Sequence, residues 1–133
     1  MLSFPPLVET SLQQLPPAAL AYLGDAVYEL YVRRLYLLPP KRLQSYHVQV
    51  VAQVRAERQA EHLRSLMPSL TESELELVKR GRNAATGRPK RVDPSVYQQA
   101  TSLETLIGYL YLTNPTRLAQ LLAQLELDTP TEL

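Results

Sequence analysis

The stretch Leu20-Ala21-Tyr22-Leu23-Gly24-Asp25-Ala26-Val27-Tyr28-Glu29 decides the fold of this chain. Pro16-Pro17 before it and Pro39-Pro40 after it are typical of helix boundaries, and they predict one helix of about 20 residues. Within this helix, large apolar side chains recur at spacings of three, four and three residues, at Leu20, Leu23, Val27 and Leu30. The spacing indicates a helix that belongs in the core.

Gly24 and Asp25 do not fit an ordinary core helix. A desolvated carboxylate is costly unless it is paired, hydrogen-bonded or bound to a metal ion, and Asp25 has no obvious cation beside it in the sequence. Glycine costs about 1 kcal/mol of helix stability relative to alanine, which is tolerable where another backbone comes close. The sequence therefore predicts a partner for Asp25.

Another helix, near the C-terminal end of the chain, repeats this combination of one acid and one glycine. The stretch Ser102-Leu103-Glu104-Thr105-Leu106-Ile107-Gly108-Tyr109-Leu110-Tyr111-Leu112 is apolar apart from Glu104. If the two helices cross near Gly24 and Gly108, the carboxylates of Asp25 and Glu104 converge, and they repel unless a divalent cation lies between them. Oxygen ligands of this kind suit Mg²⁺ or Mn²⁺.

The acids also have purely structural interpretations. Thr101 and Glu104 have the spacing of a capping box, so Glu104 could begin a helix. Glu29 could form an ion pair with Arg33, one helical turn later. His47 and His62 are isolated in the sequence, and we expect them to be structural or solvated.

The remaining pattern is helical almost throughout, which predicts an all-α fold, an antiparallel helical domain. A second helix is expected from about Leu43 to Met67, with Val50, Val51 and Val54 among its inward residues. A capping box, Thr71-Glu72-Ser73-Glu74, opens the next helix. Asp93-Pro94 and Asn114-Pro115 each have the pattern of an N-cap followed by proline at the first helical position.

Composition narrows the class of protein. The 133 residues fit one domain and carry a net charge of +1. The absence of cysteine excludes a disulfide scaffold, thiolate zinc sites and cysteine nucleophiles. The start, MLSFPPLVET, lacks the basic and apolar regions of a signal peptide, and no apolar run approaches the ~20 residues of a membrane span, so we expect a cytoplasmic protein without membrane contact.

Many of the positive charges lie in one segment, which Gly81, Gly87 and Pro89 predict to be a loop. Between residues 79 and 91 there is no acid, and the cations are Lys79, Arg80, Arg82, Arg88, Lys90 and Arg91. The segment is either a solvated surface or a contact for a polyanion. Six phosphate contacts would give a salt slope of roughly −5 on a log–log plot of affinity against salt concentration.

The two acidic helices together resemble the ribonuclease III family. Residues 20–29 are similar to its signature helix, and residues 103–112 to its second acidic helix, in the same order and at a matching separation. Within the family, Arg80-Gly81-Arg82-Asn83-Ala84 resembles a stretch of the Mini-ribonuclease III branch, whose members are a catalytic domain with no double-stranded-RNA-binding domain. The resemblance covers about residues 15–125, the expected core of a single catalytic domain over residues 1–133.

The resemblance implies an all-helical ribonuclease III endonuclease domain that forms a homodimer and hydrolyses double-stranded RNA with Mg²⁺, leaving 5′-phosphate and 3′-hydroxyl ends. In the Mini branch the implied substrate is the terminal stem of precursor 23S ribosomal RNA; whether a ribosomal protein presents it stays open. By position, Asp25 and Glu104 take the roles of the catalytic, metal-binding acids, with Mn²⁺ as a substitute ion. The candidates for RNA contact are Lys79, Arg80, Arg82, Asn83, Arg88, Lys90 and Arg91.

The sequence also departs from the family pattern. Ribonuclease III enzymes usually carry two further acids, one four residues before the position of Asp25 and one three residues before that of Glu104. This chain has Ala21 and Thr101 there. The Mini branch is similarly reduced, but the number of metal ions stays open. Two rival hypotheses remain: a ribosome-associated, non-catalytic RNA-binding protein of the same fold, and a small helical adaptor without a nucleic-acid partner.

Overall fold

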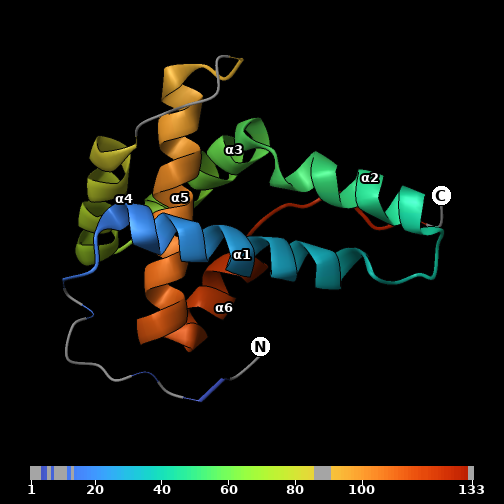
Figure 1. The fold of residues 1–133 in the computed structure, drawn as a ribbon, viewed down its shortest axis with the longest axis horizontal. Helices are drawn as coiled ribbons and strands as arrows, with labels where there is room; N and C mark the ends of the chain where they lie inside the picture. Colours follow the sequence, from blue (N-terminus) through green and yellow to red (C-terminus); the bar gives the residue numbers. More distant parts are fainter. Residues whose placement is uncertain (1–3, 6, 8–11, 13, 86–90, 132–133) are drawn as a thin grey trace.

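The prediction of an all-α fold is confirmed by a computed structural model, which describes residues 4–5, 7, 12, 14–85 and 91–131 and has no strand among them. Figure 1 shows α1 crossing in front of α5, with α4 on one side of the crossing and α3 on the other. The elements are α1 (Pro17–Tyr36), α2 (Leu43–Val54), α3 (Ala56–Leu66), a short 3-10 helix (Met67–Ser69), α4 (Glu72–Ala84), α5 (Pro94–Thr113) and α6 (Pro115–Ala123).

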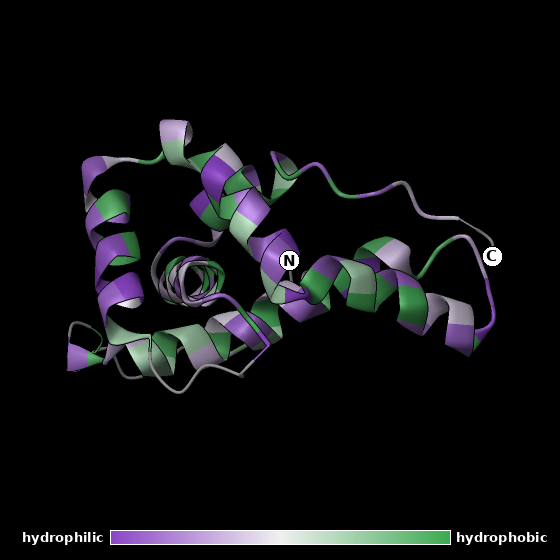
Figure 2. Ribbon diagram, turned by 90° about the horizontal axis from the view of Figure 1, so that it is seen from above, coloured by the Kyte–Doolittle hydropathy of each residue, from purple (hydrophilic) through white to green (hydrophobic). Residues whose placement is uncertain are grey.

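The helix α5 is the centre of the fold. It contacts α1, α3, α4 and α6, and Figure 2 shows it end-on, enclosed by its neighbours. Its own core side chains, Leu103, Leu106, Ile107 and Leu110, are all buried. Because α5 has neighbours on several sides, most residues in the middle of the helix are buried or half-buried, Glu104 among the latter. In the described part of the chain, no helix has both the length and the hydropathy that crossing a membrane requires.

The helix starts follow from local chemistry that the sequence makes visible. Thr71 and Glu74 form the predicted capping box, in which the Glu74 N–H donates to Thr71 Oγ1 at 3.2 Å and the Thr71 N–H donates to Glu74 Oε1 at 2.9 Å. The Asp93 side chain accepts the Ser95 N–H and starts α5, and the Asn114 side chain accepts the Arg117 N–H and starts α6. All three predicted caps are confirmed.

The prediction of one helix from Leu43 to Met67 is wrong, because the chain breaks at Arg55. The backbone of Arg55 is extended, with φ −68° and ψ 156°, and separates α2 from α3. The break lets α2 pack on α1 while α3 packs on α5. It also turns Val51 outward, so this expected core residue is 45% exposed. Neither glycine nor proline marks the break, so the sequence pattern continues through it.

The prediction of a basic loop needs correction as well. Residues 79 to 84 form the last turns of α4, and Gly81 is a buried helical residue that contacts Ser102 and Thr105 of α5. The packing against α5 explains the helix, since a glycine here lets the two helices approach closely. Of the basic candidates, Arg88 and Lys90 lie outside the described residues.

Candidate active site at the crossing of two helices

The backbones of α1 and α5 touch where the two glycines lie. A Cβ atom built on Gly24 would overlap the carbonyl oxygen of Glu104, and one built on Gly108 would overlap the carbonyl oxygen of Leu20. Glycine is therefore required at both positions by close approach, as the sequence indicated for Gly24. The contact fixes the acidic residue of each helix relative to the other, because Asp25 follows Gly24 and Glu104 lies one turn before Gly108.

The crossing brings the two predicted acids together. The carboxyl groups of Asp25 and Glu104 lie within hydrogen-bonding reach of each other, and the side chain of Gln59 on α3 lies beside Glu104 as a possible donor. Glu104 is half-buried and Asp25 is exposed, so the pair lies at the edge of the core with one side open. Burial, and next the hydrogen bond and negative charge of Asp25, raise the pKa of Glu104 to about 8.

This pair of acids has the chemistry that a hard divalent cation requires. With its pKa raised to about 8, the Glu104 carboxyl group carries a proton at neutral pH, and a cation that takes the place of this proton offsets the repulsion between the two acids. Within the described residues, no group of three or more His, Cys, Asp or Glu side chains could hold a metal ion. A site of one or two carboxylates suits Mg²⁺, which commonly keeps several waters and takes further ligands from phosphate.

The structural interpretation of Glu104 as part of a capping box is wrong. Asp93 is the N-cap of α5, and Thr101 and Glu104 lie well inside that helix. The structural interpretation of Glu29 is confirmed, since its carboxylate lies 3.0 Å from the guanidinium of Arg33 on the same helix. Glu29 is therefore explained without the paired acids.

Neither histidine is among the groups that shift the pKa of Glu104. His47 is exposed on α2. His62 is buried on α3, where its ring lies edge-on to Tyr28 at 6.5 Å between centroids. Burial lowers the pKa of His62, so its imidazole is neutral at neutral pH. The expectation that the histidines are structural or solvated fits this placement.

The basic candidates for RNA contact form an exposed group at the end of α4 and the start of α5. Lys79, Arg80, Arg82 and Asn83 are exposed on the last turns of α4, and Arg91 is exposed shortly before α5 begins. An exposed, acid-free group of cations provides an electrostatic footprint for a polyanion. Lys79, Arg80 and Arg82 are therefore held on a helix and not on the loop that the sequence predicted.

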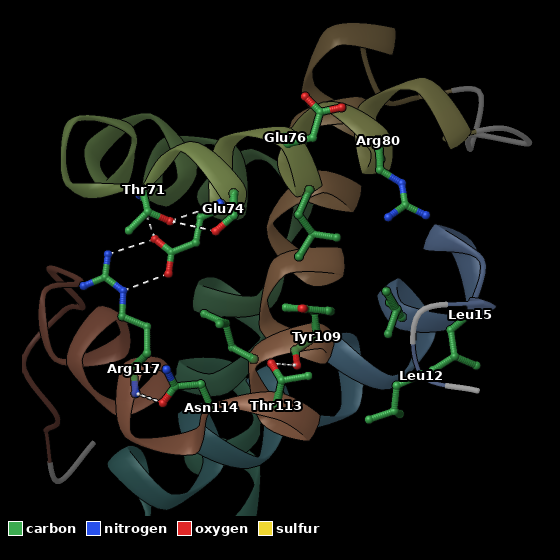
Figure 3. Close-up of a pocket in the computed structure, with 14 residues that line it drawn as sticks. Leu12, Leu15, Thr71, Glu74, Glu76, Arg80, Tyr109, Thr113, Asn114 and Arg117 are labelled. Carbon is green, nitrogen blue, oxygen red and sulfur yellow. Dashed lines mark hydrogen bonds and ion pairs between the residues drawn. The ribbon is translucent and has the colours of Figure 1, made fainter. Parts of the chain in front are cut away.

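A separate hollow of about 680 Å³ lies beside α4, α5 and α6 (Figure 3). Its most ordered feature is an ion pair that the sequence pattern did not reveal: the Arg117 guanidinium donates to both carboxylate oxygens of Glu74, at 2.8 and 2.9 Å. Asp25 and Glu104 do not line it. The Glu74–Arg117 pair joins the start of α4 to the start of α6, so its role is structural.

One face of α1 exposes apolar side chains, against the expectation that the whole helix belongs in the core. Tyr22 is 85% exposed and Leu30 is 40% exposed. Next to them, Leu23, Val27, Tyr31 and Tyr111 line a small apolar hollow. Apolar surface that gathers in one place is typical of a contact with another protein chain.

Comparisons with known proteins agree with this geometry. Residues 18–115 match the model of the family described as "Ribonuclease III domain". The chain is 57% identical over 125 residues to a protein from Synechocystis sp. named Mini-ribonuclease 3, covering 94% of this chain and 87% of the relative. A protein of the same name from Synechococcus sp. is 61% identical over 113 residues, which cover 85% and 82% of the two chains.

A solved structure is also similar. The crystal structure of a protein from Fusobacterium nucleatum superimposes with a TM-score of 0.78 at 27% sequence identity, covering 85% of this chain and 93% of that one. The structural similarity extends over 85% of this chain, and the family match over residues 18–115 includes both helices that carry the paired acids.

Proposed function

This chain belongs to the ribonuclease III family, in its Mini-ribonuclease III branch, and is an endoribonuclease. From this membership we propose that the enzyme cleaves double-stranded RNA, with Mg²⁺ held by Asp25 and Glu104. The single observation that supports the site is the contact between these two carboxyl groups at the glycine crossing of α1 and α5. Mn²⁺, which prefers the same oxygen ligands, is expected to substitute.

The two acids have distinct tasks in this proposal. Glu104 would release its proton to solvent on binding the cation, and the backbone contact between Glu104 and Gly24 keeps the Glu104 carboxylate beside that of Asp25. Asp25, which is exposed, is the acid on the side from which the phosphate backbone approaches. Asp25 and Glu104 would hold the Mg²⁺, and the ion would lower the pKa of a bound water and offset negative charge on the phosphate oxygens. Water is the nucleophile, and the products carry 5′-phosphate and 3′-hydroxyl ends.

RNA binding is assigned to Lys79, Arg80, Arg82, Asn83 and Arg91, together with Arg88 and Lys90. Double-stranded RNA is recognised mainly by its shape and by its phosphates and 2′-hydroxyls, so exposed cations and one amide are suitable contacts. As natural substrate we propose the terminal stem of precursor 23S ribosomal RNA, which agrees with the cytoplasmic location that the sequence predicts. Assistance by a ribosomal protein is compatible with this assignment.

We further propose that the enzyme works as a homodimer. A two-fold dimer presents two equivalent sites to the two strands of a duplex, whose backbone has matching pseudo-symmetry. The exposed apolar face of α1, with Tyr22 and Leu30, is the surface that a second copy would cover. Burial of such a face removes apolar area from water and so favours association.

A cleavage assay tests the proposed function. Structured double-stranded RNA is incubated with Mg²⁺ or with EDTA, using the wild type, Asp25→Asn and Glu104→Gln. We expect cleavage only by the wild type with Mg²⁺ and a loss of more than about 100-fold in both variants, since changes even to outer partners of metal ligands cost 10–100-fold. Glu29→Gln is the matched control, because Glu29 is an acid of the same helix that pairs with Arg33.

The assay also separates the rival hypotheses. Binding of RNA without cleavage, and without need of a metal, would favour a non-catalytic RNA-binding protein. No binding and no cleavage would favour the adaptor. Equal cleavage by the wild type and by Asp25→Asn would reject the acid pair as the catalytic centre.

A further inference from the structure

Gln59 is a buried glutamine with one satisfied end and one unsatisfied end. It lies on α3, is 3% exposed and donates from Nε2 to the carbonyl oxygen of Val54 at 2.9 Å. Its side chain also lies close enough to the Glu104 carboxyl group to lower the pKa of that group as a hydrogen-bond donor would. In contrast, its Oε1 atom is buried and has no hydrogen-bond partner within the described part of the chain. Buried polar atoms are rarely left in this state, so the side chain calls for an explanation.

The contact with Val54 fixes which way the amide points. Val54 is the last residue of α2, so its carbonyl oxygen has no partner within that helix and needs a donor. Only the nitrogen of the Gln59 amide can donate, and that nitrogen carries two hydrogens. With one hydrogen directed at Val54, the other is available for the carboxylate of Glu104, and the oxygen is left unpaired.

An apolar side chain of the same length at position 59 would leave no buried polar atom without a hydrogen-bond partner. The unpaired Oε1 is therefore the consequence of keeping an N–H donor beside Glu104. A neutral donor is suited to this position, because it orients a carboxylate without the positive charge that would compete with a metal cation. Partners of this kind hold metal ligands in the geometry that the ion requires.

We propose that Gln59 is a positioning residue for the acid pair, and that its amide N–H holds the Glu104 carboxylate in the orientation in which it binds a divalent cation together with Asp25. The inference rests on the proposed function of that pair. Gln59 does not itself touch the cation or the RNA in this account. The break at Arg55 is what makes the arrangement possible, since it ends α2 at Val54 and lets α3 bring Gln59 against α5.

The chain offers a matched control, a second buried glutamine one helix earlier. Gln53 is 2% exposed, and its amide bonds the side chains of Asp128 and Arg58 instead of an acid of the site. Gln53→Met and Gln59→Met therefore remove the same chemical group from comparable burial. Only the second change removes a donor to Glu104.

The test is the binding of Mn²⁺ alone, followed by electron paramagnetic resonance, together with cleavage kinetics. For Gln59→Met we expect Mn²⁺ affinity to fall about 10–100-fold, kcat to fall at saturating Mg²⁺ and the KM for RNA to stay unchanged. For Gln53→Met we expect wild-type Mn²⁺ affinity. Unchanged Mn²⁺ affinity in a folded Gln59→Met protein would overturn the inference, as would an equal loss in both variants.

A second measurement needs no variant. In the wild type, the side-chain NH₂ resonances of Gln59 are expected to shift when Mg²⁺ is added, and resonances that stay in place would overturn the inference. The proposed function fails separately: wild-type protein that binds no Mn²⁺, or whose binding is unchanged by Asp25→Asn, would reject the metal site itself.

Discussion

Gly24 lies against the backbone of Glu104 with no room for a side chain between them. The contact joins two residues eighty positions apart and places the acid of one helix beside the acid of the other. Packing and chemistry therefore depend on the same few atoms, and a change to the crossing is expected to alter both.

The first prediction concerns this crossing. Gly24→Ala should lower the free energy of unfolding by about 1–3 kcal/mol, because the new methyl group overlaps the backbone of Glu104. The result is opposite to that expected at an open helical position, where alanine gains about 1 kcal/mol over glycine. Urea denaturation measures the difference. A variant as stable as the wild type would show that the helices can separate here without cost.

The second prediction concerns pH. The pKa of Glu104 is raised in the folded protein, so between its unfolded value, near 4.5, and about 8 the folded state binds more protons than the unfolded state. The metal-free protein should therefore lose stability as pH rises from 5 to 8. Thermal denaturation across this range should show a falling midpoint for the wild type and a flatter profile for Glu104→Gln. Identical profiles would contradict the prediction.

The third prediction concerns Glu74 and Arg117. The hydrogen bonds from Arg117 lower the pKa of Glu74, so the stability they provide is present above the unfolded pKa and is lost as pH falls through the folded pKa. Arg117→Met should cost about 2–3 kcal/mol at pH 7, because hydrogen bonds to a charged group are lost and Glu74 stays nearly buried. The difference from the wild type should shrink in acid, below about pH 4, as chemical denaturation at several pH values can measure.

The fourth prediction concerns RNA. Arg82→Ala should raise the apparent KM and reduce the slope of log affinity against log salt by about 1, as expected for one lost phosphate contact. Arg42, exposed at the start of α2 and distant from α4 in the chain, supplies the control Arg42→Ala. Filter binding at several salt concentrations measures the salt slope of both variants, and cleavage kinetics measure the apparent KM. Equal slopes for the wild type and Arg82→Ala would reject this contact.

The fifth prediction concerns oligomeric state. Tyr22→Asp places a charge on the exposed apolar face of α1 and should convert the dimer into a monomer, as light scattering after size-exclusion chromatography would show. Met67→Glu is a control at a partly exposed apolar residue on the 3-10 helix. A Tyr22→Asp protein that stays dimeric would place the subunit contact elsewhere.

Much of this architecture can be predicted from the sequence, because its signals are local. Proline after Asp93 and after Asn114 sets the helix starts, and Gly24 and Gly108 mark a close crossing through their cost to a helix. The sequence shows neither the crossing itself nor its angle, so the meeting of the two acids is predicted only on the condition that the helices cross there. Periodicity also identifies most of the core, since a residue's helical face is a property of the nearby sequence.

The features that the sequence did not reveal depend on distant partners. The break at Arg55 is stabilised by the Gln59 side chain and by packing against two different helices, and no breaker residue marks it. Basic residues of α4 are helical because Gly81 packs on Thr105, which is a tertiary contact. The ion pair between Glu74 and Arg117 spans 43 positions, so no local pattern indicates it.

The segment after α6 forms hydrogen bonds with the junction between α2 and α3, where α2 ends at Val54 and α3 begins at Ala56. Asp128 accepts hydrogen bonds from Gln53 and Arg58, its carbonyl oxygen accepts one from Tyr36, and Thr131 bonds Gln49. During synthesis, Gln53 and Arg58 leave the ribosome long before these partners do. The junction that carries Gln59 therefore gains these hydrogen bonds only once the tail has emerged.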